Sequence, residues 1–470
     1  MSERYCNDSI IGVEDAQELL LAHVSLLDAE KVALGASFGR ILAQEVRSDI
    51  DISPFDNSAM DGFAVCHADF VAARPAPSRE HPLELPIIGR LGAGSVFDGE
   101  LTGGQALRIM TGAPLPRGAD TVVKIEETEV IGESDECPEG TNVRFFTIPV
   151  LGEHVRPRGE EARKGEVLLH AGDRISPAAA GLLASTGNAE VLVYRRARVG
   201  IISSGSELVA ISEIPGPGQI RNSNSYSLAA QVAEAGGEPV ILPAITDTRE
   251  AFIGALQAAV AQFDFIITSG GAAEGDFDFV TPAIRELGEL FYNKVNMKPG
   301  KAQTFGIIGS VPIFGLPGNP AAAAVGFEVL VRPALRRMQG MRALKRPVTR
   351  AVLTTDIKKV PETRRFYLRA RVERVTDGAG EGAAGVGAAA GTAAGANAGA
   401  AAGGGAASAS AAGVGTAAGY RVTPAPNQSS ALLGALNNAN CLLVVPEGLK
   451  PLAAGDTVAC LRLDMEEGVV

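Results

Sequence analysis

Residues 191–342 contain short, continuously apolar runs that alternate with amphipathic segments. The apolar runs predict strands at residues 198–203, 239–245, 263–268 and 311–316. Helices are predicted at residues 224–235 and 251–262, and another is expected after Pro320. Apolar strands that alternate with helices are typical of a parallel sheet covered on both faces. This region therefore predicts a doubly wound, mostly parallel α/β domain.

Residues 49–150 are rich in glycine, proline and β-forming residues. Short apolar runs lie between turn signals at residues 85–88 and 121–125, which is typical of a small β-rich domain. Two dense polar turns stand out here, at residues 54–62 (PFDNSAMDG) and 110–114 (MTGAP). The simplest interpretation of the first is an Asx-type turn, and neither turn identifies a reaction by itself.

The segments on either side of this β-rich region carry helical signals. Apolar positions recur at helical spacing from Val13 onward. Ser176 before Pro177 predicts a helix start with a capping side chain and proline at the first helical position. Residues 11–48 and 151–190 are therefore expected to form one linker and helical domain.

Residues 343–470 predict a C-terminal β domain with an unusual interruption. Residues 377–419 consist almost entirely of alanine and glycine, with two valines as the only large apolar residues. Such a segment cannot bury a core, and so many glycines oppose a helix. It is expected to be a disordered insertion.

Composition narrows the class of protein. The net charge of −12 is a poor basis for general nucleic-acid binding, because phosphate neutralisation needs a basic face. The cysteines and histidines are scattered, without the spacing of a zinc site or a disulfide framework. No apolar signal segment and no apolar run of about 18 residues is present, so no membrane span is expected. These features suit a cytoplasmic protein.

Three of the predicted strands end in small polar or glycine-rich loops. In an open parallel sheet, ligands bind outside the carboxyl ends of the strands. Glycines let backbone N–H groups approach an anion, and a following helix start adds a favourable dipole. Together the loops predict a phosphate- or oxyanion-binding crevice, although each alone could be an ordinary strand-to-helix turn. The loop residues are Ser203, Ser204, Gly205, Ser206 and Glu207; Ser269, Gly270 and Gly271; and Pro317, Gly318, Asn319 and Pro320.

Charged residues accompany these loops. Lys294, Lys298 and Lys301 precede the last predicted strand, and the Pro299-Gly300 turn could point Lys298 and Lys301 into the crevice. Clustered ammonium groups suit a dianion such as molybdate or a pyrophosphate, and the alternative is a solvated surface run.

Acidic residues follow two of the same strands. Asp247 follows residues 239–245, and Asp276 and Asp278 follow Gly271. Carboxylates beside phosphates are natural ligands of Mg²⁺. The alternative for Asp276 or Asp278 is a helix N-cap.

Six segments, in order along the chain, together resemble the MoeA family, which includes the E domain of gephyrin. The resemblance covers nearly the whole chain outside residues 377–419, and residues 427–448 are similar to the family's C-terminal β domain. The segments are PFDNSAMDGFAV (54–65), RIMTGAPLP (108–116), SSGSEL (203–208), SGG with GDFDF (269–279), KPGKA (298–302) and GLPGNP (315–320).

This resemblance implies four domains per subunit and an elongated homodimer. It implies an active site between the doubly wound domain of one subunit and the β-rich domain of the other. The implied reaction converts adenylyl-molybdopterin (molybdopterin-AMP) and molybdate to molybdenum cofactor and AMP with a divalent cation, Mg²⁺. A molybdopterin adenylyltransferase is a candidate partner.

The resemblance also implies roles for individual residues. Asp61 and Thr111 match residues that the partner subunit places at the cleft. Glu207, Asp247 and Asp278 match acidic site residues, and the last two are the candidate magnesium ligands. The residues that match anion-binding groups of the family are Lys294, Lys298, Lys301, Arg364 and Ser430.

The chain departs from the usual family pattern at several crevice positions. Ser206 stands where an aspartate is frequent, and Ala273 and Ala322 stand where serines are usual. Residues 159–161 read GEE in place of GED. Each loss removes a hydrogen-bonding group that could contact substrate or metal.

These departures leave a second function open, a catalytically weakened or tungstate-using paralogue that acts as a pterin carrier or scaffold. A third function, adenylylation of molybdopterin, is disfavoured because the simpler adenylyltransferases lack the domain with FDNSAMDG. A nicotinamide-dependent reaction is disfavoured because no GxGxxG opens a βαβ unit.

Overall fold

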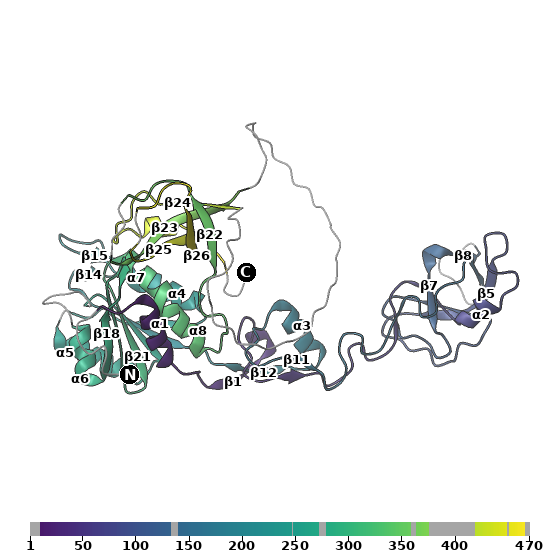
Figure 1. The fold of residues 1–470 in the computed structure, drawn as a ribbon. Coiled ribbons are helices and arrows are strands. Elements are labelled where there is room, and N and C mark those ends of the chain that lie inside the picture. Colours follow the sequence, from purple (N-terminus) through teal and green to yellow (C-terminus); the bar gives the residue numbers. More distant parts are fainter. Residues whose placement is uncertain are drawn as a thin grey trace. The chain divides into compact units, whose positions relative to one another are not determined.

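The computed structural model describes residues 10–132, 140–246, 248–271, 279–358, 363–375, 419–448 and 451–465 (Figure 1). The chain divides into two compact units. The first joins residues 1–28 to residues 195–470, and the second is residues 29–194. No helix in the described part of the chain is long and apolar enough to span a membrane.

The first unit is built on a six-stranded sheet of order β16-β13-β17-β21-β20-β18. Its first four strands are parallel, β20 runs antiparallel to β21, and β18 at the edge runs antiparallel to β20. The predicted doubly wound, mostly parallel sheet is therefore confirmed. The strands are β13 (Arg198–Ser203), β16 (Glu238–Ile241), β17 (Phe265–Ser269), β18 (Glu289–Lys294), β20 (Ala302–Ile308) and β21 (Val311–Leu316).

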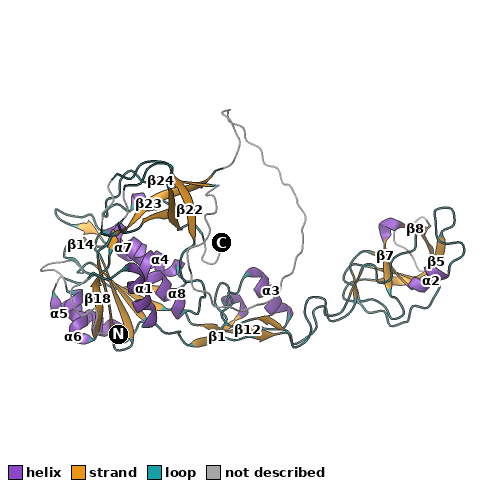
Figure 2. Ribbon diagram, in the orientation of Figure 1, coloured by secondary structure: helices purple, strands orange, loops and turns teal. Residues whose placement is uncertain are grey.

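Helices cover both faces of this sheet (Figure 2). One apolar cluster joins α5 (Arg249–Val260) and α6 (Val280–Leu287) to side chains such as Ile266 and Ile313. The other face packs against α1, α4 and a continuous helical segment, and its cluster includes Val199 and Phe314. The elements of this second layer are α1 (Val13–Ala22), α4 (Asn224–Glu234), α7 (Pro320–Gly326), the π-helical turn Phe327–Val331 and α8 (Arg332–Met338).

Two features of this unit differ from the predictions. The antiparallel pair β18 and β20 was not predicted, because its apolar residues are interrupted by asparagine, lysine, glutamine and threonine. Helix α1 groups with the α/β sheet and not with residues 29–48, because Val13, Ala16 and Leu20 are buried in the large core cluster.

The C-terminal part of the first unit is a closed β barrel. Its five strands follow the order β23-β24-β22-β26-β25, and β25 pairs again with β23. A short strand from the α/β domain, β19 (Met297–Lys298), pairs parallel with the start of β23. The barrel strands are β22 (Val348–Leu353), β23 (Arg365–Arg374), β24 (Tyr420–Pro424), β25 (Cys441–Val445) and β26 (Thr457–Arg462), with the short helix α9 (Gly434–Asn437).

The second unit contains the predicted β-rich sheet, of order β7-β4-β6-β5-β9-β8. It also contains three strand pairs and the helix α3 (Pro177–Ser185), whose predicted cap is confirmed because the Ser176 side chain accepts from the Ala179 N–H. The sheet strands are β4 (Gly62–Val65), β5 (Leu83–Leu91), β6 (Ala106–Ile109), β7 (Thr121–Lys124), β8 (Thr128–Ile131) and β9 (Asn142–Phe145), with helix α2 (His67–Ala72). The strand pairs are β1 (Ala29–Ala33) with β12 (Glu190–Tyr194), β2 (Val46–Arg47) with β11 (Val167–Leu169), and β3 (Asn57–Ser58) with β10 (Val155–Arg156).

Candidate active site

The three polar loops predicted from the sequence meet at one edge of the sheet. Strands β13, β17 and β21 are direct neighbours and parallel, so their carboxyl ends lie side by side. The loops that follow them line a cavity of about 1670 Å³. All twelve residues that the sequence placed in these loops line this cavity, and the C-terminal barrel forms the opposite wall. We call this cavity the crevice.

Glycine is required in the loop after β17. Gly270 has φ +87°, a backbone conformation that L side chains rarely adopt. A Cβ atom at this position would lie 2.5 Å from the carbonyl oxygen of Ser204 in the neighbouring loop. The two loops can therefore approach each other this closely only with glycine at residue 270.

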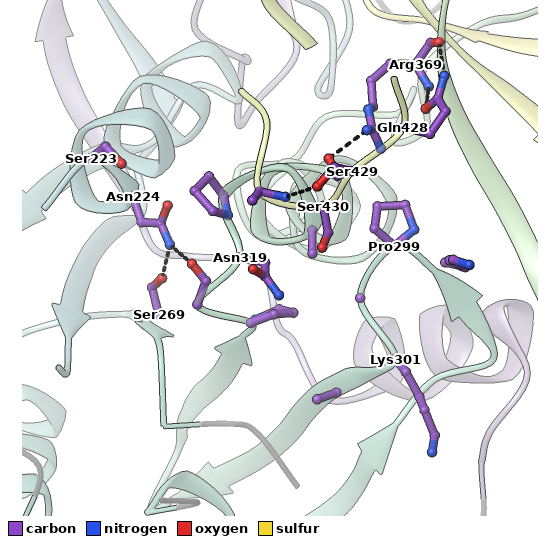
Figure 3. Close-up of a pocket in the computed structure, with 18 of the residues that line it drawn as sticks. Ser223, Asn224, Ser269, Pro299, Lys301, Asn319, Arg369, Gln428, Ser429 and Ser430 are labelled. Atoms are coloured by element: carbon purple, nitrogen blue, oxygen red, sulfur yellow. Dashed lines mark hydrogen bonds between the residues drawn. The ribbon is translucent and has the colours of Figure 1, made fainter. Parts of the chain in front are cut away.

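Asn224, at the start of α4, joins two of the loops and was not predicted (Figure 3). Its Nδ2 atom donates to Ser269 Oγ and to the Gly318 carbonyl oxygen, both at 2.8 Å. Because a carbonyl can only accept, this contact fixes the amide orientation and leaves Oδ1 as an acceptor. The buried Asn224 Oδ1 and Ser204 Oγ atoms have no hydrogen-bond partner among the described residues. The crevice therefore offers two unpaired polar atoms to a polar ligand.

The lysine turn lies between β18 and β20. Lys298 and Lys301 line the crevice, as the sequence predicted, and the Lys298 ammonium lies 4.9 Å from the centre of the Phe366 ring. Gly300, with φ +87°, allows the turn to pack against Gln303. Lys294 lies on β18 and is not among the described residues that line the crevice.

The C-terminal barrel supplies the remaining wall. Arg364 and Ser430 line the crevice, as the family resemblance implied. The Ser430 carbonyl oxygen accepts from the Ala321 N–H at 2.9 Å, which ties the barrel loop to the start of α7. Arg369, which was not predicted, also lines the crevice with only 1% of its surface exposed.

The electrostatic character of the crevice follows from its lining. Cationic side chains outnumber acidic ones among the described lining residues. The cations are Arg221, Lys298, Lys301, Arg364 and Arg369, and the acids are Glu207 and Asp356. Such a balance favours an anionic ligand even in a protein of net negative charge.

The candidate magnesium ligands Asp247 and Asp278 lie outside the described residues, as do Asp276 and Ala273. Glu207 is described and lines the crevice beside Gly205. The ranges that the structure describes contain no group of three or more histidine, cysteine, aspartate or glutamate side chains that could hold a metal ion. Of the family departures, Ser206 and the buried Ala322 both line the crevice.

Asp61 and Thr111 lie in the second unit and contact each other. The Thr111 N–H and Oγ1 both donate to Asp61 Oδ1, at 2.7 and 2.9 Å. These two bonds hold the pKa of the Asp61 carboxyl below its ordinary value, and the bond from the backbone N–H has the larger effect. Asp61 is therefore a carboxylate at neutral pH, on an exposed turn of the β-rich domain.

Comparison with known families gives three consecutive matches. Residues 11–187 match the MoeA N-terminal region (domain I and II), and residues 200–337 match a probable molybdopterin binding domain. Residues 412–463 match the MoeA C-terminal region (domain IV).

Individual relatives agree with these matches. A molybdopterin molybdenumtransferase of Bacillus subtilis (strain 168) is 39% identical over 442 residues, which are 94% of this chain and 91% of the relative. One from Staphylococcus aureus (strain COL) is 32% identical over 452 residues, 95% of this chain and 94% of the relative. A solved molybdopterin biosynthesis MoeA protein from Pyrococcus horikoshii has a TM-score of 0.73 and 27% identity, and the match covers 97% of this chain and 99% of that one.

Proposed function

The chain belongs to the MoeA family of molybdopterin molybdenumtransferases, and we propose that it inserts molybdate into adenylyl-molybdopterin, with release of AMP, in molybdenum cofactor biosynthesis. The observation that carries this proposal is the crevice. Loops suited to phosphate face a wall of cationic side chains across one cavity, as a reaction between a pyrophosphate and an oxyanion requires.

The sheet side of the crevice suits the adenylylated pterin. Backbone N–H groups of loops rich in glycine and serine can approach phosphate oxygens closely, which favours the pyrophosphate here. The unpaired Asn224 Oδ1 is a buried acceptor, and a pterin ring carries N–H groups that could donate to it. Binding of a donor would satisfy an atom that is otherwise costly to leave buried without a partner.

The side of the crevice formed by the lysine turn and the barrel suits molybdate. Molybdate carries two negative charges, and its oxo groups are poor leaving groups until that charge is neutralised. Lys298, Lys301 and Arg364 place positive charge beside the crevice and can supply this stabilisation as the dithiolene sulfurs replace oxo ligands. The aromatic ring under Lys298 restricts where its ammonium can lie.

We propose Mg²⁺ as the divalent cation that assists release of AMP. Asp247 and Asp278 would hold it, since a magnesium ion takes one or two carboxylates together with phosphate oxygens. Among the residues that the structure describes, Glu207 is the acidic residue of the same loops. Arg364 and the two crevice lysines would act on molybdate whether or not the metal is bound. Replacement Asp278→Asn should abolish turnover and leave the folded protein intact, and unchanged activity would exclude this role for Asp278.

We further propose a cytoplasmic homodimer in which Asp61 and Thr111 complete the crevice of the partner subunit. A molybdopterin adenylyltransferase would supply the substrate. The dimer is tested by light scattering after size-exclusion chromatography and by co-expression of two inactive chains, Asp61→Asn and Lys298→Ala. If the two residues act in one crevice from different subunits, mixed dimers regain turnover. A monomer, or mixed dimers without activity, would contradict the shared site.

The proposed reaction is tested with purified protein, adenylyl-molybdopterin, Mg²⁺ and molybdate. AMP release and metal bound to the pterin are measured together. We expect one AMP for each molybdenum inserted. Binding of the pterin without AMP release, or insertion with tungstate alone, would contradict the proposed function.

A further inference from the structure

We propose that Gln303 is a positioning residue. Its buried amide holds the lysine turn (residues 298–301) at a fixed distance from helix α7, and so sets where Lys298 and Lys301 meet the oxyanion. This inference rests on the proposed function, because it concerns the molybdate end of the same site. It adds a residue that neither the sequence motifs nor the family resemblance identified.

Gln303 is a fully buried polar side chain. It lies on β20, two residues after Lys301, is 0% exposed, and is not among the described residues that line the crevice. Its Nε2 atom donates to the Gly300 carbonyl oxygen at 3.2 Å, whereas its Oε1 atom has no hydrogen-bond partner among the described residues. A buried acceptor without a partner costs free energy, so an apolar side chain would serve the core better. A polar residue that costs stability beside a site points to a role in that site.

The amide of Gln303 fills the space between two glycines. One is Gly300 in the lysine turn, and the other is Gly326 at the end of α7. A Cβ atom added at Gly300 would lie 2.7 Å from Gln303 Nε2, and one added at Gly326 would lie 2.5 Å from Nε2 and 2.7 Å from Oε1. Neither position can carry a side chain unless the amide moves, because the interior is close-packed. The amide is therefore a spacer between the turn and the helix.

The lysine turn also packs directly against the start of α7. A Cβ atom added at Gly300 would lie 3.3 Å from the Ala322 carbonyl oxygen and 3.5 Å from the Pro317 ring. Pro317 belongs to the loop after β21, Ala322 belongs to the first turn of α7, and both line the crevice. The position of the turn relative to this loop therefore depends on how far the Gln303 amide holds Gly300 from the helix.

Placement of the turn matters because each ammonium is a point charge. The Lys298 ammonium lies 4.9 Å from the centre of the Phe366 ring, and the Lys301 carbonyl oxygen accepts from the Val295 N–H at 2.9 Å. These contacts hold the two ends of the turn, and the Gln303 amide holds its middle. The attraction between an ammonium and an oxyanion falls with distance. A displaced turn should therefore weaken molybdate binding and leave binding of the pterin substrate intact.

The test is a double-mutant cycle between Gln303 and Gly326 in the full-length protein. Gly326 has helical backbone angles (φ −60°, ψ −42°), so alanine is favourable there for the helix itself. Apart from the helix, the three atoms nearest to the added methyl group belong to the Gln303 side chain. Gly326→Ala should therefore act on the site through Gln303.

The cycle compares the wild type with Gln303→Ala, Gly326→Ala and their combination. Gln303→Met, which keeps the length of the side chain but loses the donor, is measured beside them. Calorimetric titration gives the affinity for molybdate. Steady-state kinetics give KM for molybdate and for adenylyl-molybdopterin separately.

We expect Gly326→Ala to raise KM for molybdate and to lower molybdate affinity about 3- to 10-fold, the scale of one lost hydrogen bond. KM for the pterin substrate should stay within about twofold of the wild type. In the Gln303→Ala background the new methyl group occupies space that the amide has left, so Gly326→Ala should have no further effect. Gln303→Met should show the same rise in KM for molybdate. It should melt within about 4 °C of the wild type, since it loses one hydrogen bond but also an unpaired acceptor.

Thr304→Val is the matched control. Thr304 follows Gln303 on β20, is 1% exposed, and is not among the described residues that line the crevice. Its replacement changes a buried polar side chain of the same strand and keeps the Gln303 amide. Both KM values should stay at those of the wild type.

Wild-type molybdate affinity in Gly326→Ala would overturn the inference, and so would an equal effect of Gly326→Ala with and without the Gln303 amide. A folded Gln303→Met protein with wild-type KM for molybdate would also overturn it. If the Gln303 variants do not fold, Gly326→Ala decides alone, because only a rise in KM confined to molybdate supports the inference. If the wild-type protein binds molybdate but does not insert it, the proposed function fails, and the molybdate affinities still test the role of Gln303.

Discussion

Asn224 Nδ2 donates to the carbonyl oxygen of Gly318 at 2.8 Å, across 94 residues of sequence. The same nitrogen donates to Ser269, so one amide holds the loop after β21 against the loop after β17. The relative position of these two crevice loops thus depends on the Asn224 side chain at the start of α4.

Replacement Asn224→Ala should therefore damage the site more than the fold. Two hydrogen bonds and a buried acceptor are lost, so kcat/KM should fall roughly 5- to 150-fold, from about 1–3 kcal/mol. The steady-state AMP-release assay measures this effect. Tyr226→Phe, on the exposed face of the same helix, is the control and should keep wild-type kinetics. Equal activity of Asn224→Ala and the control would contradict the role of Asn224.

Replacement Gly270→Ala tests the close approach of two loops. The left-handed backbone and the Ser204 carbonyl at 2.5 Å from the new Cβ should together cost roughly 1–3 kcal/mol of unfolding free energy. Turnover should fall as well, because the loop must move. Gly254→Ala is the matched control. It lies on the exposed face of α5 with nothing within 4 Å of the added atom, and should stabilise the protein by about 0.5–1 kcal/mol. Chemical denaturation of both variants measures their free energies of unfolding. A Gly270→Ala variant with the wild-type free energy of unfolding would contradict the prediction.

Replacement Lys298→Ala should weaken molybdate binding. The ammonium is one of the charges that line the crevice, and its loss should lower affinity roughly 5- to 30-fold, from about 1–2 kcal/mol. Calorimetric titration with molybdate gives the value. Lys345→Ala removes the same charge from an exposed position away from the crevice lining and should change affinity less than about twofold. A similar loss in both variants would mean that only net charge matters.

The Asp61–Thr111 contact predicts a pH effect of defined sign. Because the folded-state pKa of Asp61 is lowered, its contribution to stability is present above the unfolded-state pKa of about 3.9. That contribution is lost as pH falls through the lower folded-state pKa. Thr111→Val removes the hydroxyl donor and keeps the backbone donor, so it should raise the pKa of Asp61 toward the ordinary value. Carbon-13 NMR titration of the Asp61 carboxyl measures both values. The same pKa in both proteins would show that the hydroxyl has no influence.

The parts of the site that the sequence predicted depend on local signals. Continuously apolar strands mark β13, β17 and β21, and each loop follows its strand directly, so strand ends and loop chemistry can be recognised together. The hairpin of β18 and β20 lacks such a signal, because polar residues interrupt its apolar positions. The sequence therefore predicted that the lysines lie near a strand, but not that this strand belongs to an antiparallel pair. For the same reason Lys294 was expected in the crevice together with Lys298 and Lys301.

Asn224 and Arg369 could not be found from local patterns. An asparagine at a helix start is usually a cap, and its actual partners lie 45 and 94 residues away. An arginine in a strand is usually solvated, and the partner of Arg369 lies 60 residues away. Their contacts depend on which atoms of distant residues the fold brings to them, and no spacing rule encodes that. The expected magnesium ligands Asp247 and Asp278 and most of the Ala/Gly insertion lie outside the described residues.

The pairing of β19 with β23 has a consequence for folding. Lys298 and Met297 belong to the hairpin of the α/β domain, yet they hydrogen-bond as a strand of the sheet that forms the C-terminal barrel. A strand from the α/β domain therefore completes the sheet beside the start of β23, and neither domain can unfold without breaking the ladder bonds between β19 and β23. The two should melt in a single cooperative transition, and a truncated barrel expressed alone should show an unprotected edge in hydrogen exchange at residues 365–366.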